Sequence, residues 1–246
     1  LGQNFSKPFE VKFADKDNVE HFAWQTSWGV SWRLIGAMIM AHGDDKGLVL
    51  PPKVAPMQIV IVPIYRNEEG KNSVLPKVEE IQNKLESKDI RIHVDDREGL
   101  SPGYKFNDWE LKGVPLRIEI GPKDIENQKI VVAKRYNLEK IDLSFEEIEK
   151  IPLILDEIQV EMLKKAKEQA QNNTLEITDY LEFKSKIEKG GFFNSPWCGK
   201  LECEDKIKEE TGAEIRVIPF NSEDNTKECI YCKEPSTSIP IFARGY

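Results

Sequence analysis

Hydrophobic and polar positions change their spacing along the chain, and this divides it into three stretches. In the first, residues 9–13 and 20–25 alternate apolar and polar side chains around a turn-rich segment, which predicts a β-hairpin. Residues 33–40 carry the spacing of a short helix, and 48–50 form a brief apolar run that predicts a strand. Three prolines within 51–56 mark a linker.

The second stretch alternates between strand and helix patterns. Residues 58–63 form a continuous, largely β-branched run, as in a strand that is buried on both faces. Alternating elements of this kind predict a small α/β domain around a mixed sheet. The other expected elements are helices over 74–88 and 108–112 and strands over 90–94, 116–120 and 129–133.

The third stretch begins with two charged amphipathic helices, expected over 156–171 and 176–189, the second of which ends at Gly190 and Gly191. A further helix over 202–211 and a strand over 214–219 follow. The pattern as a whole predicts a mixed α/β (α+β) fold.

The charge of the chain narrows the classes of function. The 246 residues carry a net charge of −8, which argues against a protein that coats DNA through a basic surface. No apolar run approaches the roughly 20 residues of a membrane span, and no secretory signal is visible. We therefore expect a cytoplasmic protein that binds neither membrane nor DNA. The first residue is Leu1 rather than Met, so we expect a fragment of a longer protein.

All four cysteines lie near the end of the chain, as the pairs Cys198/Cys203 and Cys229/Cys232. Two close pairs about 25 residues apart have the spacing of a zinc site, because each turn directs two thiolates at one ion. Two disulfides or free buried thiols are the alternatives, and the first is disfavoured without a secretory signal. A site with four thiolates leaves no open position, so this zinc would be structural.

Three motifs in sequence order carry a resemblance to a known family. Together with the four-cysteine segment and the ending 242–246, they resemble prolyl-tRNA synthetases of the archaeal/eukaryotic type. These are class II enzymes that join proline to its tRNA. The motifs are Gln25–Gly36, which is similar to class II motif 3, His42–Pro52, and the stretch from Pro102 to Pro122.

The resemblance implies that class II motifs 1 and 2 lie upstream of Leu1. The chain would then be the C-terminal half of the enzyme, unable alone to activate or transfer proline. It implies three parts: residues 1–56 as the end of the antiparallel-sheet catalytic domain, 57–152 as an α/β anticodon-binding domain with a mixed sheet, and 153–246 as a C-terminal α/β zinc lobe.

The resemblance also implies roles for residues of motif 3. Arg33 would be the catalytic arginine that holds the ATP phosphates, and a guanidinium suits this role because it forks two hydrogen bonds onto phosphate oxygens. Ser31 would contact the nucleotide, and Ser27 and Gly29 would line the aminoacyl pocket. The family usually has Thr or Ser where this chain has Trp32. Taken alone, Arg33 would be an ordinary surface arginine.

The C-terminal residue Tyr246 resembles the tyrosine that folds back to the aminoacyl pocket in this family. A frayed chain end is the alternative.

The anticodon of tRNA(Pro) ends in two guanines, so its reader needs hydrogen-bond donors and acceptors. Lys105, Arg117 and Lys123 offer donors to guanine O6 and N7, and Glu110 offers an acceptor. Phe106 and Trp109 offer surfaces for stacking on splayed bases. The alternative for these two aromatic residues is a place in the core.

These features predict a proline–tRNA ligase that binds tRNA(Pro), proline and ATP with Mg, forms prolyl-adenylate and transfers proline to the tRNA. The full-length protein is expected to be a homodimer with one structural zinc per chain. A stand-alone, non-catalytic tRNA anticodon-binding module is the second hypothesis. An intact motif 3 argues against it, because a binding module has no use for Arg33.

Overall fold

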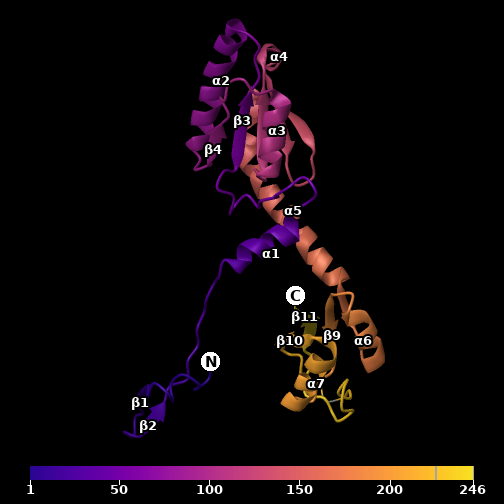
Figure 1. Ribbon diagram of the computed structural model, residues 1–246. Helices are drawn as coiled ribbons and strands as arrows, with labels where there is room; N and C mark the ends of the chain where they lie inside the picture. Colours follow the sequence, from indigo (N-terminus) through magenta and orange to yellow (C-terminus); the bar gives the residue numbers. More distant parts are fainter. Residues whose placement is uncertain (225, 246) are drawn as a thin grey trace.

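The computed structural model describes residues 1–224 and 226–245. Figure 1 shows a slender N-terminal segment, a body built around a sheet, and a C-terminal lobe reached through one long helix. Tyr246 lies outside the described residues, so its expected place in an aminoacyl pocket stays a prediction. Within these two ranges, no helix has both the length and the apolar character that crossing a membrane requires.

The N-terminal segment contains the predicted hairpin and helix. Strands β1 (Lys12–Ala14) and β2 (Glu20–Phe22) pair antiparallel and are largely exposed. Helix α1 (Arg33–His42) begins at the first residue of the predicted helix and has no buried residue. Of the antiparallel sheet expected for 1–56, the described residues supply this one hairpin.

The predicted strand over 48–50 is wrong as a sheet element. The backbone N–H of Leu48 donates to the carbonyl of Leu111 (3.0 Å), and that of Leu50 donates to Gly113 (3.2 Å). Their partners are the last residue of helix α3 (Pro102–Leu111) and a residue of the turn that follows it, and neither belongs to a strand. The apolar run is therefore explained by packing against a turn.

A five-stranded mixed sheet forms the centre of the body, in the order β4-β3-β5-β6-β7. Strand β3 runs parallel to β4 and β5, and β5, β6 and β7 are successively antiparallel. The predicted mixed sheet is thus observed, with β7 as a strand that the pattern did not reveal. The strands are β3 (Ile59–Pro63), β4 (Ile92–Val94), β5 (Leu116–Ile120), β6 (Lys129–Lys134) and β7 (Lys140–Ser144).

Helices cover both faces of this sheet. Helix α3 packs with Val60 and Val62 on one face, whereas helix α2 (Glu68–Glu86) and the start of α5 (Ile151–Asn172) pack with Ile59 and Ile61 on the other. Both faces of β3 are therefore shielded from solvent, as its β-branched run predicts. The short helix α4 (Pro122–Glu126) and a 3₁₀ helix (Phe145–Lys150) complete this domain.

Helices α2 and α3 begin earlier than their apolar spacing predicts because polar residues cap them. The Asn67 side chain accepts a hydrogen bond from the Gly70 N–H (2.9 Å), and the Ser101 hydroxyl accepts one from Tyr104 (3.2 Å). Such caps satisfy backbone donors of the first turn. The first turn of each helix is thus fixed by polar contacts that a search for hydrophobic periodicity does not detect.

The C-terminal lobe has its own four-stranded sheet and core. The sheet has the order β10-β11-β9-β8, and its core contains Phe183, Phe193 and Phe242, which meet edge to face. This lobe follows α5, which replaces the predicted helix over 156–171. Its elements are β8 (Thr174–Glu176), α6 (Tyr180–Ile187), β9 (Phe192–Asn194), α7 (Leu201–Thr211), β10 (Ala213–Val217) and β11 (Ile241–Arg244).

Gly113 leaves no room for a side chain, which gives a test of the contact between 48–50 and α3. Its φ is +72°, and a Cβ there would lie 2.6 Å from backbone atoms of Leu48. We expect Gly113→Ala to lower the free energy of unfolding by at least about 2 kcal/mol, measured by urea denaturation. Gly103→Ala, with open space around the new methyl group, should change stability by no more than about 1 kcal/mol. Equal effects would contradict this packing.

Candidate functional site

The motif 3 residues lie in one exposed stretch that leads into α1. Ser27, Gly29 and Ser31 are exposed on the extended segment, and Arg33 is the first residue of the helix. The Arg33 N–H lies 3.4 Å from the Ser31 hydroxyl oxygen, and the Ser31 carbonyl accepts from Leu34. Ser31 thus accepts hydrogen bonds from two backbone N–H groups of the first turn. The group of Arg33 that remains available to bind an anion is its guanidinium.

Trp32, the departure from the family pattern, occupies the N-cap position of α1 and is 87% exposed. Its indole makes no side-chain cap. The residue therefore imposes no local strain on Arg33, and the backbone enters the helix without its help.

A pocket of about 230 Å³ lies beside α3 and β5, and we call it the β5–α3 pocket. Trp109 contributes apolar surface, and the charged lining consists of one acidic residue, Glu110, and five basic ones: Lys46, Arg117, Lys134, Arg135 and Lys140. The Glu110 carboxylate accepts from Arg117 at 3.1 Å. Acceptor and donors thus converge on one small cavity, which is the requirement for reading the edge of a guanine base.

Lys140 was not predicted, and strand register explains its place in the pocket. Arg117 on β5 pairs with Ala133 on β6, which pairs with Lys140 on β7. The small Ala133 side chain lets its two cationic neighbours reach the same region of the sheet surface. The Lys140 ammonium lies 2.9 Å from a carboxylate oxygen of Glu119. Nothing in the local sequence indicates this pairing, because it requires knowing that β7 exists.

Arg117 is held in place on all sides before any ligand arrives. Its side chain is 8% exposed, and it donates to Glu119 at 2.9 and 3.1 Å as well as to Glu110. Its guanidinium lies 4.2 Å from the centroid of the Phe106 ring, a cation–π distance. Phe106 is therefore brought together with Glu110 and Arg117, and its ring supports Arg117.

Of the other residues expected to contact bases, Lys105 and Lys123 do not line the pocket, and Trp109 lines it only from the core. Lys105 is buried, and its ammonium donates to the Asp95 carbonyl at 2.8 Å. Trp109 is 5% exposed and belongs to the core, the alternative noted for it. Lys123 is exposed on α4 and does not line the pocket. The side chains of Lys105 and Trp109 are used instead to hold α3 on the sheet.

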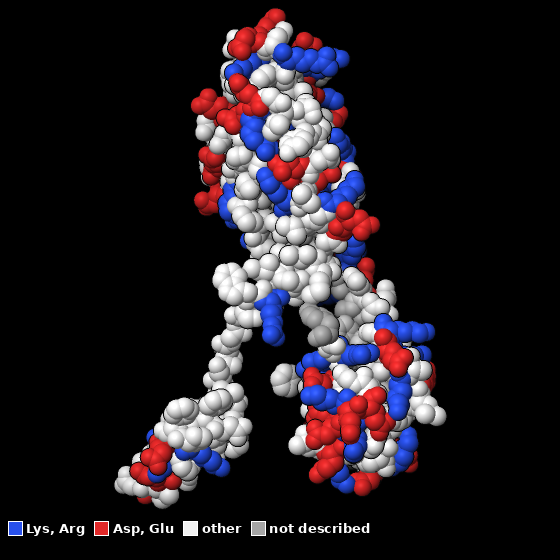
Figure 2. Space-filling model, viewed as in Figure 1, with Lys and Arg blue, Asp and Glu red and all other residues white. Residues whose placement is uncertain are grey.

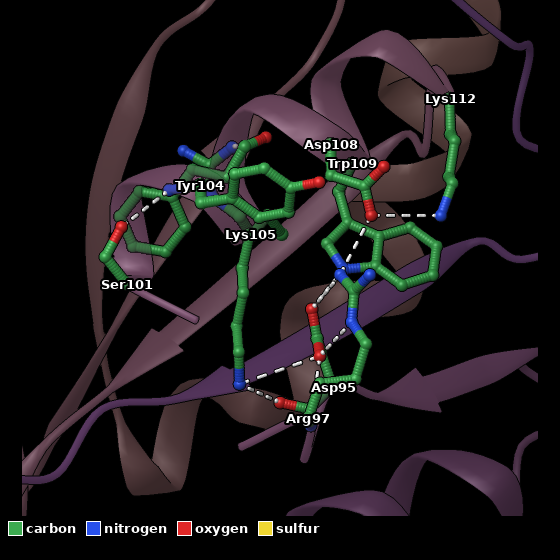
Figure 3. Close-up of polar contacts among 10 residues, drawn as sticks. Asp95, Arg97, Ser101, Tyr104, Lys105, Asp108, Trp109 and Lys112 are labelled. Carbon is green, nitrogen blue, oxygen red and sulfur yellow. Dashed lines mark hydrogen bonds and ion pairs between the residues drawn. The ribbon is translucent and has the colours of Figure 1, made fainter. Parts of the chain in front are cut away.

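The anchor of α3 is the carboxylate of Asp95, which follows β4 and is fully buried (Figure 3). It accepts from the Trp109 indole N–H at 2.7 Å and from the Arg97 guanidinium at 2.7 and 2.9 Å. Arg97 also reaches Asp108 at 2.8 Å, which in turn accepts from Lys112. A single carboxylate therefore connects the end of β4 with two turns of α3.

Burial alone would raise the pKa of the Asp95 carboxyl. Hydrogen bonds from Arg97 and Trp109 and the charge of Lys105 outweigh this effect and hold the pKa well below its usual value. Asp95 is therefore ionised at neutral pH, and its charge is compensated by two neighbouring cations.

Charged residues are mixed over the visible surface of the sheet domain, as Figure 2 shows, and acidic side chains gather over the C-terminal lobe. This distribution agrees with the net charge of −8. On the face shown, a nucleic acid would therefore be held by local contacts rather than by a continuous basic surface.

The four cysteines form one cluster in the C-terminal lobe. Their sulfur atoms all lie within 4.8 Å of one another, and the Cys198 sulfur is 3.6 Å from those of Cys203 and Cys232. These distances exceed the roughly 2.05 Å of a disulfide and approach the roughly 3.8 Å edge of a ZnS₄ tetrahedron with Zn–S bonds of about 2.3 Å. The cluster could hold a metal ion.

The chemistry of the cluster also fits a cation. Burial raises the pKa of the Cys198 and Cys203 thiols, whereas backbone hydrogen bonds outweigh burial and lower the pKa of Cys229. Without a positive charge nearby, Cys198 and Cys203 therefore stay protonated at pH 7. A divalent ion between the sulfurs would supply the charge that stabilises thiolates. The geometry therefore suits a metal better than free thiols or disulfides.

Comparisons with known proteins place these features in a family context. Residues 58–153 match the family described as "Anticodon binding domain", and residues 180–246 match "Prolyl-tRNA synthetase, C-terminal". The proline–tRNA ligase of Cenarchaeum symbiosum is 54% identical, with 100% of this chain and 52% of that protein covered. One from Porphyromonas gingivalis is 47% identical, with 100% and 50% covered.

A crystal structure shows the same likeness in three dimensions. Prolyl-tRNA synthetase from Cryptosporidium parvum, complexed with L-proline and AMP, superposes with a TM-score of 0.90 at 39% identity, covering 100% of this chain and 52% of that one. Over its whole length, the chain is similar to prolyl-tRNA synthetases. It spans about half the length of the relatives it matches.

These similarities confirm the resemblance to prolyl-tRNA synthetases and the mixed α/β fold class predicted from the sequence. Apart from Lys46, the residues that line the β5–α3 pocket fall within the stretch that matches the anticodon-binding family, and the cysteine cluster falls within the C-terminal one.

The Asp95 anchor predicts a pH-dependent loss of stability on mutation. Asp95→Asn removes the counter-charge of the buried Lys105 ammonium and of the partly exposed Arg97 guanidinium, so we expect the free energy of unfolding at pH 7 to fall by about 3 kcal/mol. Because the folded-state pKa of Asp95 is depressed, its contribution is complete above about pH 4 and is lost as the pH falls further. The difference between wild type and variant should therefore shrink below about pH 4.

Urea denaturation at pH 7, 5 and 3.5 measures this effect. The matched control is Asp142→Asn, which breaks an exposed pair with Lys129 and should cost no more than about 0.5 kcal/mol. A difference between Asp95→Asn and wild type that is independent of pH would contradict the assignment.

Proposed function

We propose that this chain is the C-terminal half of a proline–tRNA ligase. That enzyme would activate proline with ATP to prolyl-adenylate, release pyrophosphate and transfer proline to tRNA(Pro). The observation that carries the proposal is the likeness of the whole chain to a prolyl-tRNA synthetase whose structure holds proline and AMP. A second candidate, the stand-alone anticodon-binding module, leaves the Gln25–Gly36 motif without a use.

Arg33 would act as the phosphate-binding group in the activation step. It stands at the start of α1 with an exposed side chain, and a guanidinium fixed there stabilises the negative charge that develops as pyrophosphate leaves. Ser31, whose hydroxyl lies beside the Arg33 backbone, would contact the nucleotide. Ser27 and Gly29 would line the aminoacyl pocket with Tyr246, and ATP would enter with Mg.

The β5–α3 pocket would read the anticodon. Glu110 would accept from the Watson–Crick edge of one guanine, while Arg117 and the newly found Lys140 would donate to O6 or N7. Their mutual ion pairs orient them before the base binds, which lowers the entropic cost of recognition. Lys123 could still meet the tRNA outside this pocket.

Zinc is the metal that best suits the four-cysteine cluster. Cys198, Cys203, Cys229 and Cys232 would be its ligands, and four thiolates without an open position make a structural site. The metal would stabilise a lobe whose own apolar core is small. It would take no part in the reaction.

The proposal keeps the three-part division expected from the sequence, with boundaries near residues 56 and 152. The stretch matched to the anticodon-binding family, 58–153, and the separate cores of the sheet domain and the C-terminal lobe support it. A homodimer of the full-length protein and a cytoplasmic location stay predictions from the family resemblance.

The zinc proposal predicts local unfolding on metal loss. Cys229→Ser, at a fully buried sulfur, should abolish zinc binding and remove hydrogen-exchange protection from residues 180–245, because the metal contributes folding energy. The strands β3 and β5 should keep their protection. Metal analysis of purified protein should find about one zinc per chain.

Ser195→Ala provides the matched control in the same lobe. The Ser195 hydroxyl is buried without a hydrogen-bond partner among the described residues, so its removal should leave zinc content unchanged and stability equal or higher. Protein without bound metal, or unfolding spread evenly over the chain, would refute the structural zinc.

The activity itself is tested with the full-length protein. We expect proline-dependent ATP–pyrophosphate exchange and charging of tRNA(Pro). Arg33→Ala should lower both by at least about 100-fold, whereas Glu110→Gln should lower kcat/KM for charging by about 10- to 100-fold, and more than it lowers exchange.

The control for these variants is Lys129→Gln, which removes an exposed cation of the same sheet and should leave both rates within about twofold. Charging of a tRNA for another amino acid, or tRNA binding without exchange, would overturn the proposed function. The second of these results would favour the anticodon-binding module.

A further inference from the structure

An ion pair between the exposed carboxylate of Asp44 and the buried guanidinium of Arg135 joins the turn after α1 to the sheet domain. The Asp44 carboxylate accepts from the two terminal nitrogens of Arg135 at 2.7 and 2.5 Å, across 91 residues of sequence. The Arg135 side chain is 2% exposed. These hydrogen bonds lower the pKa of Asp44 to about 2, so the pair is charged at neutral pH. Bidentate geometry of this kind fixes orientation as well as distance.

Arg135 also donates to the backbone of α3 beside the β5–α3 pocket. Its Nε donates to the backbone carbonyl of Glu110 at 2.9 Å, and its own backbone N–H donates to Pro115 at 2.9 Å. The guanidinium therefore bridges Asp44 on one side and Glu110 on the other. The side chain of Glu110, in turn, is one of the groups that would contact a bound base.

The turn after α1 also reaches the pocket directly. Lys46 lines the β5–α3 pocket, and its backbone N–H donates to the Asp44 carboxylate at 2.9 Å. Asp44 follows the last residue of α1, His42, by two positions. The same helix begins at Arg33, about 15 Å away along a ten-residue helix.

Close packing prevents this junction from absorbing a movement locally. A Cβ on Gly47 would lie 2.7 Å from backbone atoms of Leu111, and Gly113 is equally tight against Leu48. The hydrogen bonds from Leu48 and Leu50 to the end of α3 and the turn that follows it add to this contact. A shift of Glu110 and its neighbours would therefore move the turn after α1 as a unit.

We propose that Asp44 and Arg135 are positioning residues that couple the base bound in the β5–α3 pocket to α1, and through α1 to Arg33. The proposal rests on the proposed function, since it requires both an anticodon reader and a phosphate-binding arginine. When the cognate anticodon engages Glu110 and Lys46, the ion pair places α1 for the charging reaction. Neither residue contacts the reacting atoms.

The test compares charging of two RNAs by the full-length protein. One is tRNA(Pro), and the other is the same tRNA with one anticodon guanine replaced by adenine. The ratio of their kcat values is the anticodon effect. For wild type we expect a ratio of at least about 10, within the range of measured couplings. For Asp44→Asn we expect it to fall to about 1–3, through loss of kcat on the cognate tRNA alone.

Two further variants separate coupling from simple destabilisation. Asp44→Glu keeps a carboxylate and should recover part of the ratio, and Asp142→Asn, which breaks an exposed pair, should behave as wild type. Circular dichroism melting curves of all variants show whether they are folded.

Three results would overturn the coupling. These are an unchanged ratio in Asp44→Asn, an equal loss of kcat on both tRNAs, and a wild-type anticodon effect confined to KM. Absence of any charging of tRNA(Pro) by wild type would instead refute the proposed function. Failure of both Asp44 variants to fold would show that the pair serves stability, and this too would overturn the proposal.

Discussion

The carboxylate of Asp95 is the contact on which the rest of the candidate site depends. It fixes the indole of Trp109 and, through Arg97, the flank of α3 against the sheet. That helix then presents Glu110 to the pocket and its last turn to the segment 44–50. An unpaired carboxylate at this depth would strongly destabilise the fold. The hydrogen bonds and ion pairs around Asp95 therefore have to form together. The need to compensate the buried charge of Asp95 therefore fixes the position of α3 and, with it, the geometry of the pocket.

Much of the sheet could be predicted from the sequence because buried positions are occupied by apolar residues. The β-branched run at 58–63 indicates a strand buried on both faces, and the structure places helices against both of them. Arg33, Glu110 and Arg117 could be singled out because short motifs keep them at fixed spacing. The cysteine cluster followed from the two pairs alone.

The remainder depends on contacts between distant parts of the chain. Lys140 enters the pocket only through the register of β7, which no local pattern revealed. Lys105 and Trp109 have the chemistry of base-contacting residues, yet the nearby Asp95 engages both. The Asp44–Arg135 pair joins residues 91 positions apart. In each case the residue types were visible in the sequence, whereas their partners depend on the tertiary fold.

Helix α5 carries the chain from the sheet domain into the C-terminal lobe without a break (Figure 1). Its first half is anchored in the core through Ile154 and Ile158, while its later turns are largely exposed. Each residue of a helix advances the chain by about 100° around the axis. One residue inserted into the exposed turns would therefore swing the whole lobe to another side of the enzyme. The number of residues in α5, rather than the strength of any contact, thus sets the direction in which the C-terminal lobe and its cysteine cluster point.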